Sequence, residues 1–185
     1  NGARCAVAFA ETLGIDISEI TFDAIDGPHW ASKTKDQIRI QMGDVLQIQA
    51  NKNEFELNTG SPHYVKLSED ISSDTILNFG KSIRFSSKYQ EKGINVNLLK
   101  GITPTSIEIA TYERGVENET LSCGTGATAC ALVWDKIQNA NVNFVEIKVK
   151  GGILKVEFTR NKSEGYNNIY LSGPANFIYS GEVNL

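Results

Sequence analysis

The 185-residue sequence is poor in cysteine, histidine, methionine and proline, and it has no long apolar run. Three cysteines are too few, and odd in number, for a disulfide scaffold, which favours a reducing compartment. The longest apolar stretches, Cys5–Ala10 and Ala129–Trp134, are six residues each, far short of the ~20 that a membrane-spanning helix needs. No basic region followed by an apolar core opens the chain. We therefore expect a cytoplasmic protein without a secretory signal or membrane contact.

The charge balance is mildly acidic, with 18 Lys and Arg against 22 Asp and Glu and a formal net charge of −4. This balance speaks against a sequence-blind nucleic-acid binder, which needs a basic face for phosphates. Apolar residues make up 41% and charged residues 22%, as in an ordinary globular protein. The chain begins at Asn1, without Met, inside a predicted helix start. We therefore expect it to be a fragment or a processed product.

Apolar periodicity predicts more strands than helices. Helices are expected at Ala3–Leu13, Asp74–Phe85 and Gly124–Gln138, the first with an apolar stripe that includes Phe9 and Leu13. Alternation predicts strands at Ile20–Ile25, Gln37–Met42, Glu54–Leu57, His63–Leu67, Ile94–Leu99, Ser106–Tyr112, Phe144–Val149, Ile153–Phe158, Asn168–Ser172 and Phe177–Tyr179. Hairpins outnumber strand–helix–strand units. The pattern is typical of the α+β class with antiparallel sheets.

An internal repeat relates the first helix to the third. In the stretches that begin at Asn1 and Thr125, Gly2 corresponds to Gly126, and a helix rich in small residues follows each glycine. Cys123-Gly124 precedes the second copy. We infer that a Cys-Gly pair, or something close to it, belongs before Asn1.

Cys123 stands where a reactive thiol would be expected. It opens the third helix in Cys-Gly-Thr-Gly, and the first N–H groups of a helix carry partial positive charge without an internal partner. A carboxylate bound there would place its α-carbon beside the thiol, and the same field would lower the pKa of Cys123 and make it a usable base. Cys5 and Cys130 lie on apolar stripes of helices, so we expect both thiols to be buried and inert.

Two other sites are weaker interpretations of the same residues. Gly124-x-Gly126-x-x-Ala129 fits a dinucleotide fingerprint, but polar residues 117–122 stand where that fingerprint needs a buried strand. Three scattered cysteines and two histidines show no paired ligand spacing, so no metal is expected.

Two histidines and one pair of charged residues are further candidates for the site. His29 is predicted to be a surface or packing residue. His63 follows the tight turn Gly60-Ser61-Pro62, so a functional and a structural role stay equally open. Glu113-Arg114 is either a solvated ion pair or a pair that recognises an amino acid's ammonium and carboxylate groups.

These residues together resemble the diaminopimelate epimerase family. The stretches that carry the resemblance are Asn1-Gly2-Ala3-Arg4-Cys5, Gly60-Ser61-Pro62-His63, Asn95-Val96-Asn97, Glu113-Arg114-Gly115, Glu119-Thr120, Cys123-Gly124-Thr125-Gly126 and Leu171-Ser172-Gly173-Pro174-Ala175. They occur in order along essentially the whole chain. The stretch from Glu113 to Gly126 is the most specific of them.

The resemblance implies a cofactor-free isomerase that interconverts LL- and meso-diaminopimelate, in lysine and peptidoglycan precursor synthesis. In that family one thiolate removes the α-proton and an opposing thiol returns a proton to the other face. Cys123 matches the second cysteine, whereas the first belongs to the pair expected before Asn1, so we expect the 185-residue chain alone to be inactive. His63 and Glu113 are the implied catalytic supporting groups.

The resemblance also assigns substrate contacts, a fold and an assembly. The implied substrate-binding residues are Asn1, Gly2, Ser61, Asn95, Glu113, Arg114, Gly124 and Thr125, with Ser61 standing where the family usually has Asn. The implied fold has two pseudo-symmetric lobes, each a mainly antiparallel sheet around a central helix, with the first lobe incomplete. Residues 1–50, with 175–185 returning to them, would form the first lobe and residues 51–174 the second. Tyr179 matches a tyrosine associated with homodimer formation.

Two rival functions stay open at this point. A proline or hydroxyproline racemase would keep the cysteine pair and take a cyclic amino acid, although Glu113-Arg114 favours the diaminopimelate type. A non-catalytic binding module would use the ordered helix terminus only to hold small anions.

Overall fold

The computed structural model describes residues 1–24, 27–140, 142–161 and 165–182. Within these ranges the chain forms α1 (Gly2–Thr12), β1 (Ile20–Ala24), β2 (Gly27–Thr34), β3 (Gln37–Gln41), β4 (Gln49–Asn51), β5 (Glu54–Asn58), β6 (Pro62–Leu67), α2 (Ser73–Arg84), β7 (Asn95–Thr103), β8 (Ser106–Glu113), β9 (Asn118–Glu119), α3 (Gly124–Gln138), β10 (Phe144–Val149), β11 (Gly152–Arg160) and β12 (Tyr166–Gly173).

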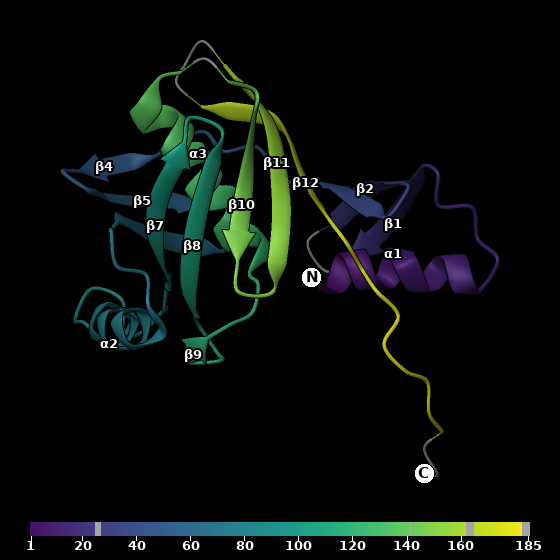
Figure 1. Cartoon of the computed structure of the whole chain (residues 1–185), viewed down its shortest axis with the longest axis horizontal. Helices are drawn as coiled ribbons and strands as arrows, with labels where there is room; N and C mark the ends of the chain where they lie inside the picture. The colour runs from purple at the N-terminus through teal and green to yellow at the C-terminus, as the bar shows by residue number, and fades with distance from the viewer. Residues whose placement is uncertain (25–26, 141, 162–164, 183–185) are drawn as a thin grey trace.

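One mixed sheet connects all of the described strands (Figure 1). Its order is β1-β2-β3-β12-β11-β10-β8-β7-β6-β5-β4, with β9 paired to β8. The pairs β6–β7 and β8–β10 are parallel, and the others are antiparallel. This arrangement confirms the α+β class. Among the described residues, each helix is too short or too polar to cross a membrane.

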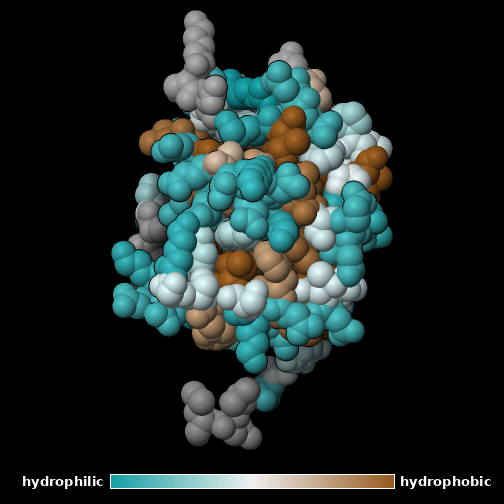
Figure 2. Space-filling view, turned by 90° about the vertical axis from the view of Figure 1, so that its left-hand side faces the viewer, coloured by the Kyte–Doolittle hydropathy of each residue, from teal (hydrophilic) through white to brown (hydrophobic). Residues whose placement is uncertain are grey.

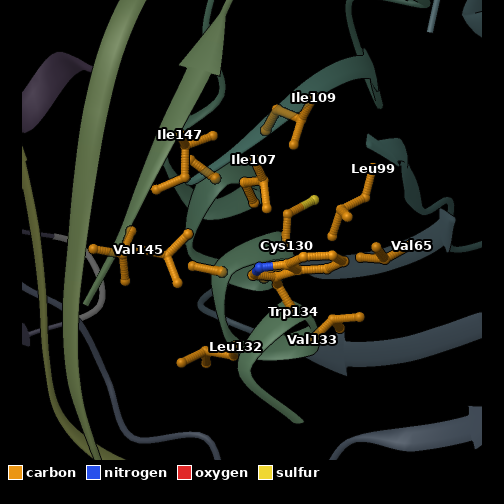
Figure 3. Close-up of a cluster of buried hydrophobic side chains, with 14 of the residues drawn as sticks. Val65, Leu99, Ile107, Ile109, Cys130, Leu132, Val133, Trp134, Val145 and Ile147 are labelled. Atoms are coloured by element: carbon orange, nitrogen blue, oxygen red, sulfur yellow. The ribbon is translucent and has the colours of Figure 1, made fainter. Parts of the chain in front are cut away.

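Helix α3 is the centre of the larger core and has the bounds that the sequence predicts. The curved sheet surrounds it, and α3 contacts β5, β6, β7, β8, β10, β11 and β12. Figure 3 shows side chains such as Leu132 and Cys130 of this helix among aliphatic residues of the strands. Both are fully buried, so the prediction of a buried Cys130 is confirmed. Burying a leucine side chain contributes about 1.5–3 kcal/mol.

Helix α1 covers a smaller core formed by Val7, Ile17, Ala31, Ile38 and Ile40. Its buried residues are Arg4 and Val7. The predicted apolar stripe is wrong, because Phe9 and Leu13 are 62% and 65% exposed. Cys5 is exposed as well, so the prediction of a buried thiol at this position is also wrong.

Three strands were missed by the sequence analysis, namely β2, β4 and the two-residue β9, and one predicted strand is wrong. Strand β2 begins with Gly-Pro and ends with Lys-Thr, and its backbone pairs with β1 and β3. Strand β4 is three exposed residues paired with β5. Residues 177–179 form no strand; Tyr179 is 82% exposed and lies in the extended tail that leaves β12 (Figure 1).

A third core lies between α2 and the sheet. Ile76 of α2 packs with Val96, Leu98 and Tyr112 of β7 and β8. The side of the molecule that carries α2 and β4 is mostly hydrophilic (Figure 2). The division of the chain into lobes at residue 50 stays a prediction.

Candidate functional site

A cavity of about 820 Å³ lies where the N-terminal ends of α1 and α3 meet. Its walls come from the first turn of α1, β1, β2, the end of β3, the 59–60 turn, the end of β8 and the start of α3. The Asn1 side-chain amide donates to the carbonyl oxygen of Ser122 (2.6 Å), and the Arg4 guanidinium donates to Asn1 Oδ1 (2.7 Å). The N-terminal ends of two helices and one buried cation therefore face the same space, which favours a carboxylate there.

The start of α3 is determined by the residues that surround it. Cys123 is the N-cap in extended geometry, with φ −121° and ψ 109°. A Cβ atom at Gly126 would lie 2.7 Å from Asn97 Oδ1 and 3.3 Å from Cys123 Sγ, so only glycine fits without displacing them. The absence of a side chain therefore lets α3 sit directly against β7.

The Cys123 thiol faces this cavity but is only 7% exposed. Its sulfur lies 3.5 Å from Thr125 Oγ1 and accepts from the backbone N–H of Gly126. Burial raises the pKa of Cys123 above its usual value, although both of these hydrogen bonds lower it, and the nearby Glu113 charge raises it further. The prediction of a lowered pKa is wrong, because desolvation outweighs the hydrogen bonds that lower the pKa. Cys123 is therefore a protonated thiol near neutral pH.

His63 lies behind Thr125 and not on the cavity wall. Its ring is fully buried, and Nε2 lies 2.9 Å from Thr125 Oγ1. Burial, and secondarily the Arg114 charge, lower the pKa of His63 to about 3. The imidazole is therefore neutral at physiological pH. His29, by contrast, lines the cavity and stacks on Phe22, with ring centroids 5.6 Å apart.

Asn95, Ser61 and Arg114 form a hydrogen-bonded group that does not line the cavity. The Asn95 amide donates to Ser61 Oγ (2.8 Å), and the backbone N–H of Arg114 donates to Asn95 Oδ1 (2.8 Å). The Arg114 guanidinium donates to the carbonyl oxygen of Lys92 (2.9 Å). In this conformation these residues hold the turn before His63 and the end of β8.

The structure thus divides the site residues that the resemblance implies into three groups. Those that line the cavity are Asn1, Gly2, Glu113, Cys123, Gly124 and Thr125. His63, Ser61, Asn95 and Arg114 lie behind or beside it. Tyr179 lies outside both groups, exposed in the tail.

Sequence reasoning missed Arg4 and Asn97. Arg4 is 6% exposed, lines the cavity, and within the described residues its Nε and Nη1 atoms are buried without a hydrogen-bond partner. The signal in the sequence was an arginine among the small residues of a predicted helix, because burying a guanidinium charge is costly. Asn97 is fully buried beside His63. It stands in Asn95-Val96-Asn97, a stretch that carries the resemblance, but no local pattern assigns it a role.

Comparisons with known proteins show which sequences this chain resembles. The family profile described as diaminopimelate epimerase matches residues 55–178. The chain is 45% identical over 184 residues to a diaminopimelate epimerase of Flavobacterium psychrophilum, covering 99% of the chain and 72% of the relative. It is 36% identical to a protein of the same name from Chlorobaculum tepidum, covering 100% of the chain and 74% of that relative.

Solved structures share the fold at low sequence identity. A phenazine biosynthesis protein of the PhzF family from Bacillus anthracis matches with a TM-score of 0.77 at 10% identity, covering 100% of this chain and 75% of that one. A probable proline racemase from Agrobacterium radiobacter matches with a TM-score of 0.70 at 12% identity, covering 99% and 66%. At these identities the likeness establishes the fold alone.

Proposed function

The chain belongs to the diaminopimelate epimerase family, and we propose that it supplies the Cys123 half of a site that interconverts LL- and meso-diaminopimelate. The reaction would serve lysine and peptidoglycan precursor synthesis in the cytoplasm. The observation that carries the proposal is the meeting of two helix N-termini at one cavity beside a thiol. The family match also favours this substrate over the cyclic amino acid of a proline racemase.

The proposed chemistry is an exchange of one α-proton between two faces of the substrate. A thiolate opposite Cys123, expected from the resemblance and outside this chain, takes the α-proton and leaves a carbanion. The Cys123 S–H bond then breaks, its proton forms the new C–H bond, and the sulfur keeps the electron pair. The raised pKa of Cys123 supports this role, because the donor must begin protonated.

Charge stabilisation would come from groups that are already in place. As the α-proton leaves, negative charge spreads onto the substrate carboxylate, which we place at the N-terminal ends of α1 and α3. Donors fixed in this way contribute ~3–4 kcal/mol each to a transition state in other enzymes. The proposed contacts to the substrate carboxylate are Asn1, Gly2, Gly124 and Thr125. Glu113 is the proposed partner of a substrate ammonium group.

The groups behind the cavity are assigned supporting roles. His63 acts on Cys123 only through Thr125, and Ser61, Asn95 and Arg114 are proposed to reach the substrate when it is bound or to hold the residues that do. Substituting Ser61 by alanine distinguishes direct contact from scaffolding, because direct contact predicts weaker substrate binding at unchanged thermal stability.

Substrate-dependent exchange of the α-proton with deuterated water tests the proposal. In a form of the protein that also carries the opposing cysteine, Cys123→Ser should reduce epimerisation by several orders of magnitude while the fold is retained. Cys5→Ser is the matched control, since it removes an exposed thiol away from the cavity and should leave turnover unchanged. Near wild-type turnover of the Cys123 variant would refute the assignment.

A homodimer through the C-terminal tail is the proposed assembly. Phe177, Ile178 and Tyr179 are 75–82% exposed, and a run of exposed apolar residues marks an interaction surface. Tyr179→Asp should shift sedimentation toward the monomer without loss of secondary structure. An unchanged sedimentation coefficient would place the dimer contact elsewhere.

A further inference from the structure

The orientation of one buried amide determines where the proton sits on His63. Asn97 Nδ2 lies 3.0 Å from the carbonyl oxygen of Tyr64, and a carbonyl can only accept. Asn97 Oδ1 accepts from the hydroxyl of Thr111 (2.9 Å). The amide is therefore fixed with its nitrogen toward His63, whose Nδ1 lies 3.1 Å from that nitrogen.

Because Asn97 donates to Nδ1, a neutral His63 must carry its proton on Nε2. Nε2 then donates to Thr125 Oγ1 at 2.9 Å. The Asn95 amide also lies 3.5 Å from Nε2, but its two hydrogens have closer acceptors at Ser61 Oγ (2.8 Å) and Pro62 O (3.3 Å). Asn95 therefore does not reverse the direction of the His63 hydrogen bond.

The next link in the chain is the Thr125 hydroxyl. Since its oxygen accepts from His63, its own proton is available to the Cys123 sulfur at 3.5 Å. That contact stabilises the thiolate form, which Cys123 must adopt once it has given up its proton. The charge of Glu113, at the end of β8, also acts on this sulfur and raises the pKa of the thiol, and Arg4 of α1 lines the same cavity.

We propose that Asn97 is a positioning residue: it fixes the Nε2–H tautomer of His63 so that the Thr125 hydroxyl donates to Cys123. The close fit of Asn97 Oδ1 against Gly126, the residue whose N–H also meets the sulfur, supports the same role. The proposal deepens the proposed function and rests on it for the role of Cys123. It is built on contacts within the chain and needs no bound substrate.

The tautomer is measured directly by long-range ¹H–¹⁵N correlation spectra of the 185-residue chain labelled at histidine. Only two histidines are present, and His29→Gln assigns them. At pH 7, His63 should show a protonated Nε2 and an unprotonated Nδ1. A protonated Nδ1 in the wild-type chain overturns the proposal without any further variant.

The effect on the thiol is measured by alkylation with iodoacetamide as a function of pH, followed by mass spectrometry of the peptide that contains Cys123. Asn97→Leu should move the Cys123 profile to higher pH and slow alkylation below its midpoint by roughly fivefold, the effect of losing one modest hydrogen bond. Exposed Cys5 is an internal reference whose rate should not change. Thr128→Val, which removes another buried hydroxyl of α3, is the matched control.

A double-mutant cycle separates the proposed role from simple packing. If Asn97 acts through the His63 ring, Asn97→Leu should leave the Cys123 profile unchanged in a His63→Leu background. A shift of the same size in both backgrounds means that Asn97 only packs against the helix, which contradicts the proposal. Because none of these measurements requires turnover, their failure is distinguishable from failure of the epimerase assignment.

Discussion

Gly101 lies directly against the indole ring of Trp134: a Cβ atom built at this glycine would be 2.0 Å from Cη2 of that ring. The ring cannot move away freely, because its Nε1–H donates to the carbonyl oxygens of Thr103 (3.1 Å) and Pro104 (3.2 Å). Strand β7 therefore approaches the C-terminal half of α3 more closely than any other residue would permit.

This contact predicts that Gly101→Ala destabilises the fold. Inserting a methyl group into a packed contact costs about 1–3 kcal/mol of the free energy of unfolding. Urea denaturation measures the effect. Gly43→Ala is the matched control, since a Cβ atom there meets nothing within 4 Å, and a loss of equal size in both variants would contradict the packing argument.

Acid should destabilise the protein through His63. The folded-state pKa of this histidine is lowered to about 3, whereas an unfolded chain takes up the proton near pH 6.5. Its contribution to stability is therefore complete above pH 6.5 and is lost as the pH falls toward 3. At pH 5 the loss is about 2 kcal/mol.

Urea midpoints between pH 4 and pH 7 check this prediction. His63→Gln should flatten the dependence, whereas His29→Gln should retain most of it. A steep dependence that survives in the His63 variant assigns acid sensitivity to other groups.

Alkali should destabilise the protein through its buried thiols. Burial raises the pKa of both Cys123 and Cys130, so each thiol is held neutral in the folded state. Their contribution is present below the usual thiol pKa and is lost as the pH rises above it, from about pH 8 to 9.5. Unfolding midpoints across this range should decline. Cys123→Ala should reduce the slope, and an unchanged slope would contradict the role of this thiol.

The proposed position of the substrate carboxylate predicts that two substitutions at Asn1 weaken substrate binding to different extents. Asn1→Asp would place a carboxylate beside Arg4 at the N-terminal end of α1, where the substrate carboxylate is proposed to bind. Both Asn1→Asp and Asn1→Ala lose the side-chain amide, but only the aspartate repels the substrate carboxylate, by ~1 kcal/mol or more. Calorimetry should therefore show diaminopimelate binding about tenfold more weakly to Asn1→Asp than to Asn1→Ala. Equal affinities for the two variants would place the carboxylate elsewhere.

The sequence predicts the central helix well because local signals agree there. Cys-Gly-Thr-Gly opens α3, small apolar residues fill it, and its bounds match the prediction. Strand β2 escaped prediction because its Lys33 and Thr34 resemble a loop, and only the neighbouring strands β1 and β3 make this segment a strand. Phe177–Tyr179 shows the reverse, since three consecutive apolar residues with strand propensity have no partner strand there.

The candidate site could be predicted in part. Its lining by Asn1, Gly124 and Thr125 follows from the repeat, because each residue stands at or beside a helix start. The contact between His63 and Thr125 joins residues 62 positions apart, and no local pattern encodes it. The pKa of Cys123 could not be predicted for a similar reason: the helix start is local, whereas the burial that dominates comes from the whole fold.

Strand β12 is bonded to β3 on one side and to β11 on the other, so backbone hydrogen bonds run without a break beneath both walls of the cavity. Two domains joined by a flexible linker can move apart freely. The two parts of this sheet, on either side of β12, cannot separate without breaking backbone hydrogen bonds. Widening the entrance for a substrate must therefore come from torsion of the sheet about β12 or from rearrangement of the 59–60 turn. The relative orientation of α1 and α3 therefore depends on this continuous ladder, and the proposed proton exchange between two sulfurs requires that orientation to be fixed.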